Sequence, residues 1–102
     1  MYNLTITELA QNDLDEIVKY ILNEYSNEIA AVTFLEEVEK CYSFLQNNPR
    51  IYGTCLNNRL EKEGYRRAPI KNYLLIYKIN DITKTVTIMR FFYSAQDYLS
   101  LI

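Results

Sequence analysis

Residues 64–94, with the sequence GYRRAPIKNYLLIYKINDITKTVTIMRFFYS, hold the pattern that decides the fold. The stretch is rich in β-branched and aromatic residues, which favour strands, and a polar run at residues 80–84 has a length suited to a hairpin loop. It therefore predicts an antiparallel meander. Because side chains alternate along a strand, one face of the sheet receives Tyr73, Leu75, Tyr77 and Ile79, and the other receives Leu74 and Ile76. Both faces are apolar, so we expect the sheet to be covered at least partly on both sides.

The residues before the meander favour one strand and two helices. Residues 2–7 alternate polar and apolar, which predicts a short strand, and Thr7 is placed to cap a helix over residues 8–25. The acids Asp13, Asp15 and Glu16 lie near the positive end of that helix dipole. A polar break at residues 26–28 precedes a second helix, which Pro49 ends. We expect the two helices to pair as an antiparallel hairpin.

The segment from residue 50 to residue 63 is irregular and is interpreted as a loop, with a helical turn at residues 57–63. The predicted fold class is α+β: an N-terminal strand and an antiparallel helical hairpin packed on a three- to four-stranded, mainly antiparallel sheet. At this length, residues 1–102 make a single domain. The helical hairpin is expected to cover one face of the sheet. The other cover is either the C-terminal tail or something that the chain does not supply.

Charge is divided unevenly along the chain. Residues 1–63 hold 5 Lys or Arg against 11 Asp or Glu, whereas residues 64–102 hold 6 against 2. The net charge of −2 therefore hides a basic half that coincides with the meander. This basic half is the clearest functional signal in the sequence, because cations on a sheet can meet an anionic partner.

Several classes of function are excluded or disfavoured by composition. The chain has no His, which excludes imidazole acid–base chemistry and imidazole metal ligands. Cys41 and Cys55 lack the spacing of a metal clamp or a redox pair, and the 2 glycines form no phosphate loop. We therefore expect neither a metal nor a cofactor. No apolar run approaches the roughly 20 residues of a spanning helix, and no signal-peptide pattern begins the chain, so we expect a cytoplasmic protein without membrane contact.

Arginine supplies the leading candidates for function. Arg66 and Arg67 are adjacent in a strand, so their side chains point to opposite faces: one could pair with the acidic helices and the other could face a partner, or both could be solvated edge charges. Pro69 favours an edge position for this strand. Arg90 interrupts an apolar strand, so it is either paired with an acid such as Asp97 or a ligand for an anion.

Three further residues complete the candidate set for target binding. Lys71 is either a plain turn residue or a ligand, and Tyr93 and Tyr98 either pack or stack on bases. Cleavage of RNA through a 2′-oxygen would need a base, donors for the phosphorane charge and an acid. Arginine fills only the second role, so the base would be a tyrosine, a lysine or a carboxylate such as Glu61 or Glu63. The target-binding candidates are Arg66, Arg67, Lys71, Arg90, Tyr93 and Tyr98.

Four segments together resemble the RelE/ParE superfamily, the small toxins of type II toxin–antitoxin pairs often called plasmid stabilisation proteins. They are residues 10–21 (AQNDLDEIVKYI), Leu45 with Pro49 and Gly53, residues 64–77 (GYRRAPIKNYLLIY), and residues 87–97 (TIMRFFYSAQD). The resemblance implies a strand, a helical hairpin and a three-stranded meander. It also implies growth inhibition, neutralisation by a cognate antitoxin, and either a homodimer or a toxin–antitoxin hetero-oligomer.

The resemblance implies two alternative activities. RelE-like members cleave mRNA in the ribosome with basic residues and a C-terminal Tyr or His; here Arg66, Arg67, Arg90 and Tyr93 would be the catalytic candidates. ParE-like members block DNA gyrase and are not known as nucleases. Leu74 stands where RelE-like nucleases have an arginine, and Gln96 stands where both groups commonly have one. The arginine lost at Leu74 and the lack of an evident catalytic base favour a ParE-like toxin without chemistry of its own, whereas Gln96 departs from both groups and favours neither. The alternatives are a RelE-like nuclease or an inactive protein that binds only an antitoxin.

Overall fold

The computed structural model describes residues 1–96 and residue 98, and it confirms the α+β fold class. In chain order the elements are β1 (Asn3–Ile6), α1 (Glu8–Tyr25), α2 (Glu28–Asn47), α3 (Asn58–Lys62), β2 (Arg66–Ile70), β3 (Tyr73–Asn80) and β4 (Thr85–Tyr93). The strands form one sheet in the order β1-β4-β3-β2. Neighbours within the meander are antiparallel, and β1 pairs with β4 in parallel, so the sheet is mixed.

Side-chain caps fix where both long helices begin. The hydroxyl of Thr7 accepts a hydrogen bond from the backbone N–H of Ala10 at 3.1 Å, and the amide oxygen of Asn27 accepts one from Ala30 at 3.1 Å. Each bond satisfies one of the backbone donors left open at a helix start. Between the helices, Ser26 adopts a left-handed conformation with φ of 47°, which turns the chain sharply. The hairpin predicted from the polar break is therefore confirmed.

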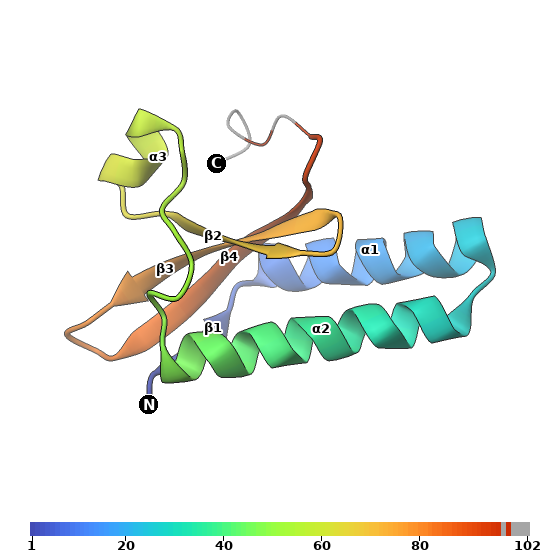
Figure 1. Cartoon of the computed structure of the whole chain (residues 1–102), viewed down its shortest axis with the longest axis horizontal. Helices are drawn as coiled ribbons and strands as arrows, with labels where there is room; N and C mark the ends of the chain where they lie inside the picture. Colours follow the sequence, from blue (N-terminus) through green and yellow to red (C-terminus); the bar gives the residue numbers. More distant parts are fainter. Residues whose placement is uncertain (97, 99–102) are drawn as a thin grey trace.

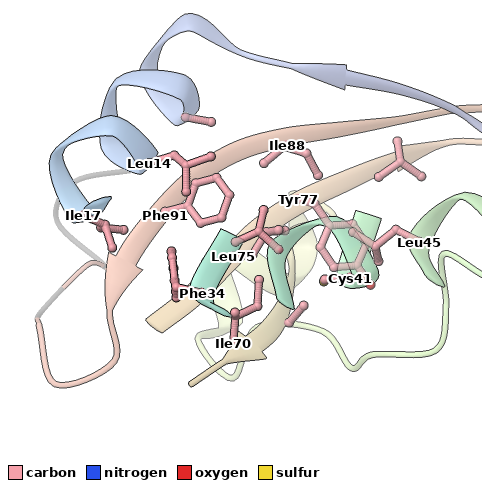
Figure 2. Packing of buried hydrophobic residues seen from close by; sticks show 14 of the residues in the cluster. Leu14, Ile17, Phe34, Cys41, Leu45, Ile70, Leu75, Tyr77, Ile88 and Phe91 are labelled. Carbon is pink, nitrogen blue, oxygen red and sulfur yellow. The ribbon is translucent and has the colours of Figure 1, made fainter. Parts of the chain in front are cut away.

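The helical hairpin covers one face of the sheet, here called the inner face (Figure 1). Figure 2 shows Phe34 of α2 between Leu14 and Ile17 of α1 on one side and Ile70 of the sheet on the other. Tyr77, in the middle of β3, is fully buried, and its hydroxyl donates to the carbonyl oxygen of Pro49 at 2.7 Å. This bond fastens the end of the helical hairpin to the central strand.

The opposite, outer face carries a second, smaller core. Buried Leu74, Ile76 and Phe92 of the sheet pack there against Cys55 and Leu60. Among the described residues, the main cover is α3 with the loop before it, which Figure 1 shows on the far side of the sheet from α1 and α2. The sequence predicts the C-terminal tail or an absent partner at this place; Tyr98 of the tail does pack against the cluster, and residues 97 and 99–102 lie outside the described residues. The buried anchor of the described cover is Leu60, a lone apolar residue in a charged turn.

The β2 edge of the sheet is partly closed by the loop between α2 and α3. The backbone N–H of Cys55 donates to Tyr65 at 3.0 Å, and that of Arg67 donates to Gly53 at 3.1 Å. Further along, Pro69 has no N–H to offer, which agrees with the predicted edge position. In the described part of the chain, none of the helices is long and apolar enough to cross a membrane.

The hydroxyl of Tyr77 provides a test of this packing. Tyr77→Phe leaves the Pro49 carbonyl without its buried donor, so we expect a loss of about 1–3 kcal/mol in the free energy of unfolding. Chemical denaturation measures it. Tyr93→Phe is the matched control, because Tyr93 is 49% exposed and its hydroxyl can bond to water. Equal stability of both variants would contradict the role given to Tyr77.

Candidate functional site

On the edge away from β3, the last part of β4 has no strand beside it, and α1 takes the place of one. β1 pairs with β4 only as far as Ile88, whereas β4 runs on to Tyr93. Beyond that point, the hydroxyl of Thr7 donates to the carbonyl oxygen of Met89 at 3.0 Å, and Asp13 accepts from the N–H of Phe91 at 3.0 Å. Side chains of the N-cap and the second helical turn thus satisfy backbone groups at an otherwise open edge.

A bulge in β4 accompanies this change of neighbour. Tyr77 of β3 pairs with Ile88, but the preceding Ile76 pairs with Arg90, so Met89 is the extra residue. A bulge re-aims the side chains that follow it. Phe91 still faces the inner core, while Met89 and Phe92 pack on the outer face. Arg90, directly after the bulge, reaches the edge where Asp13 lies.

Arg90 and Asp13 form a partly buried ion pair. The Nε and Nη2 atoms of Arg90 donate to the two carboxylate oxygens of Asp13 at 2.7 and 3.1 Å, and the side chains are only 23% and 18% exposed. The guanidinium also lies 4.7 Å from the centre of the Phe92 ring. The hydrogen bond to Asp13 raises the pKa of Arg90, so its charge is permanent.

Of the two alternatives for Arg90, the structure thus shows pairing with an internal acid. The partner is Asp13 rather than the suggested Asp97, which lies outside the described residues. Sequence reasoning took Asp13 for a helix-dipole acid. The signal that it missed is its helical position between Ala10 and Ile17, beside the buried stripe, where an acid needs a partner.

A concavity of about 1000 Å³ opens beside this ion pair, between the connected ends of the two helices and the sheet. Its walls come from α1, the first half of α2, the β2–β3 turn and the end of β4. Three of the six target-binding candidates, Lys71, Arg90 and Tyr93, line it, as does Gln96. Inside it, the ring of Tyr73 makes edge contacts with Phe34 and Tyr93, at centroid distances of 5.3 and 5.7 Å.

The rim of the concavity is apolar and exposed. Ile29 at the start of α2 is 78% exposed, and Tyr20 and Tyr93 are about half exposed. Lys71 stands on the rim at the β2–β3 turn with φ of 54°, so its assignment as a turn residue is confirmed. Exposed apolar side chains around a hollow are typical of a protein-binding surface rather than of a monomer's solvent face. Sequence reasoning missed Tyr20 and Ile29, because the sequence of a helix does not show whether an apolar residue at these positions is buried against the sheet or exposed.

Arg66 serves the fold. On the inner side, its Nε and Nη2 atoms donate to the carbonyl oxygen of Tyr52 at 3.2 and 2.6 Å. A hydrogen bond from Arg66 also opposes the rise in pKa that burial causes in Tyr77. Arg66 therefore holds the loop after α2 in place by binding the carbonyl oxygen of Tyr52, and not by pairing with an acid of the helices.

Arg67 lies on the outer face, opposite Ile76, as its adjacency to Arg66 predicts. Its side chain is partly buried, and its guanidinium makes no hydrogen bond or ion pair with any residue that the structure describes. Tyr98 lies on this face too, stacked on Phe92 with a centroid distance of 5.6 Å. The six candidates therefore divide between the inner loop, the outer face and the concavity. Within residues 1–96 and 98, no cluster of acids or cysteines could hold a metal ion.

A helical hairpin on a four-stranded mixed sheet is the architecture of RelE/ParE toxins, and comparisons with known proteins agree. Residues 4–98 match the family described as the ParE toxin of the type II toxin–antitoxin system parDE, and the chain belongs to this family. The toxin–antitoxin complex RelBE2 from Mycobacterium tuberculosis contains a chain 30% identical to this one, with a TM-score of 0.63. The match covers 90% of this chain and 96% of that one.

Two other solved structures share the fold at lower identity. The chromosomal ParDE system from P. aeruginosa matches with 17% identity and a TM-score of 0.68, covering 91% of this chain and 96% of that one. The intact E. coli RelBE complex matches with 15% identity and a TM-score of 0.64, covering 94% and 100%. No curated protein sequence matches the chain. The protein is thus a type II toxin of the RelE/ParE group, and its relatives include both branches.

The pair of Asp13 and Arg90 can be tested by a double-mutant cycle. Because the pair is partly buried and Asp13 also binds the Phe91 N–H, we expect Asp13→Ala to lower the free energy of unfolding by about 2–4 kcal/mol. Adding Arg90→Ala should cost little more, giving a coupling of about 1 kcal/mol or above. The exposed pair of Arg50 and Asp81 is the control, with weaker coupling expected. Additive losses for Asp13 and Arg90 would contradict the account.

Proposed function

We propose that this toxin acts in the ParE manner: it binds DNA gyrase or a related topoisomerase and inhibits it without chemistry of its own. The observation that carries the proposal is the separation of the four nuclease candidates. Arg66 is bonded to the Tyr52 carbonyl, Arg90 is neutralised by Asp13, and Arg67 lies on the outer face. Tyr93 lines the concavity. Cleavage needs base, acid and charge-stabilising donors around one phosphate, and these four residues do not surround one point.

The outer face supports the same proposal. Leu74, where the nucleases have an arginine, is 7% exposed and packs with Ile76 and Phe92. A charge introduced into that cluster would lose its hydration without gaining a partner. The centre of this face is thus built as a core, whereas a catalytic surface for RNA would be polar and hydrated. An inhibitor that works by binding needs only the shape and charge of its surfaces.

A supercoiling assay tests the proposed activity. Relaxed plasmid, purified gyrase and ATP are incubated with increasing amounts of the purified toxin, and the topoisomers are separated on a gel. We expect inhibition that is complete when toxin exceeds gyrase, because a bound inhibitor acts stoichiometrically. Unimpaired supercoiling at micromolar toxin would contradict the proposal.

The second candidate function is ribosome-dependent cleavage of mRNA. Its support is the 30% identity to the toxin of the RelBE2 complex, which is higher than the identity to the P. aeruginosa ParDE structure. Primer extension on translated mRNA separates the two candidates, since cuts at ribosomal A-site codons would favour cleavage. If expression in cells without antitoxin proves harmless, the third interpretation, an inactive antitoxin-binding protein, is favoured.

We further propose that a cognate antitoxin covers the concavity with an amphipathic segment. The exposed apolar rim at Tyr20, Ile29 and Tyr93 supplies anchor positions, and the hollow gives room for the anchors of a helix. Three related structures are complexes of a toxin with its antitoxin, which supports a partner of this kind. Both the antitoxin and the target would meet the toxin in the cytoplasm.

Ile29 provides the test of this docking site. Ile29→Asp places a charge on the apolar rim, and we expect the affinity for the antitoxin encoded next to the toxin gene to fall about tenfold or more, as for an interface anchor. Calorimetric titration measures the affinity. Ile82→Asp is the matched control, because Ile82 is 96% exposed at the tip of the β3–β4 hairpin. Equal loss in both variants, or none in Ile29→Asp, would contradict the location.

A further inference from the structure

The outer face of the sheet holds two cations that have no acidic partner among residues 1–96 and 98. Arg67 of β2 lies opposite Ile76 of β3, and Lys78 is two residues further along the same face of β3. Both are partly buried, and neither forms an ion pair with a described residue. The ammonium of Lys78 lies over the ring of Tyr65, 4.2 Å from its centre. We call Tyr65, Arg67 and Lys78 the cationic strip.

Arg90 shows how this fold treats an arginine that serves only structure. Arg90 and Arg67 flank Ile76 from the two neighbouring strands. Arg90 turns to the sheet edge, where Asp13 neutralises it with two hydrogen bonds. Arg67 keeps its charge on the face, although placing two like charges on neighbouring strands is unfavourable for folding. The repulsion between Arg67 and Lys78 weakens the fold, and a role in binding an anionic partner would explain why both charges are present.

The chemistry of the strip fits a protein partner better than a nucleic acid. The chain has a net charge of −2 and a pI of about 5.1, whereas domains that bind a polyanionic duplex are typically basic overall. Met89, which is partly buried, packs on the same outer cluster as Tyr65, and Leu56, which follows the buried Cys55 of that cluster in the chain, is 77% exposed. Arginine, tyrosine and methionine with exposed apolar neighbours are the composition enriched at protein interfaces.

We propose that the cationic strip binds carboxylates on an acidic surface of the toxin's protein target. This inference rests on the proposed function, because it gives the inhibited enzyme its contact surface. None of the three residues of the strip lines the concavity. Target and antitoxin therefore use different residues, and charge reversal on the strip leaves the antitoxin site intact.

Charge reversal separates this role from general charge effects. The test variant is Arg67→Glu/Lys78→Glu. The matched control is Lys19→Glu/Lys40→Glu, which makes the same change in net charge on the helical hairpin, where both lysines are more than half exposed. Circular dichroism, thermal unfolding and antitoxin binding confirm that each variant is folded. The readouts are growth arrest on expression and inhibition of gyrase supercoiling at two salt concentrations.

We expect the strip variant to need about tenfold or more toxin for half-inhibition of gyrase, because like charges now face the target. The control should match the wild type. Inhibition by the wild type should weaken with salt, and inhibition by the strip variant should lose that dependence. Growth arrest by the strip variant should weaken in parallel while its antitoxin affinity stays unchanged.

Other outcomes separate the strip from the proposed function. The wild type could arrest growth without inhibiting gyrase, while the strip variant does not arrest growth. In that case the topoisomerase proposal fails, and the cationic strip is still the target-binding surface, but for another target. Unchanged growth arrest by the strip variant overturns the strip. A harmless wild type also overturns it. Tight binding of the wild type to duplex DNA alone, lost on charge reversal, would overturn the protein partner in favour of a nucleic acid.

Discussion

The carboxylate of Asp13 binds the backbone at an edge of β4 where a neighbouring strand would otherwise be needed. β1 is only four residues long and leaves the end of β4 without a neighbour on that side. Asp13 accepts hydrogen bonds from the N–H of Phe91 and from the Nε and Nη2 atoms of Arg90, while Thr7 donates to the Met89 carbonyl. Each unpaired backbone group at this edge would otherwise cost about 1–3 kcal/mol. Helix α1 can therefore extend beyond the edge of the sheet. The part of α1 that extends there forms one wall of the concavity together with the start of α2.

This constraint also decides what the arginines can do. Arg90 is occupied at the edge and Arg66 holds the loop after α2, so Arg67 keeps its charge available on the outer face. The sheet then separates two surfaces of different character. The inner side ends in a hollow with an apolar rim, suited to an amphipathic segment. The outer side carries a cationic strip beside a small apolar core. A toxin that works by binding can use such a division, because one surface can recognise the target while the other recognises the antitoxin.

The fold could be predicted from sequence because its local signals agree with one another. The alternation at residues 73–79, the cap at Thr7, the polar break at residues 26–28 and the edge position of Pro69 all appear in the structure as expected. The opposite faces of Arg66 and Arg67 followed from the two-residue period of strands. The parallel pairing of β1 with β4 could not be foreseen in the same way, because it depends on where the helical hairpin returns the chain.

The site was less predictable, because its contacts join residues far apart in the chain. Asp13 and Arg90 are 77 residues apart in the chain, and the sequence around either residue does not indicate that the other is its partner. The bulge at Met89, which brings Arg90 to the edge, leaves no sequence signature of its own. Leu60 as the outer cover was hidden in a charged five-residue helix. Sequence reasoning misses Lys78, because its role depends on its spatial neighbours, Arg67 of β2 and Tyr65 just before that strand.

The most direct test of the account is hydrogen–deuterium exchange of the toxin, free and bound to gyrase. If the toxin inhibits by binding through its outer face, amides of β2 and of the second half of β3 should gain protection in the complex. Amides at the rim of the concavity, at the start of α2, should exchange as in the free toxin. Protection at the start of α2 with no change in β2 and β3 would contradict the account, as would the absence of any protected segment.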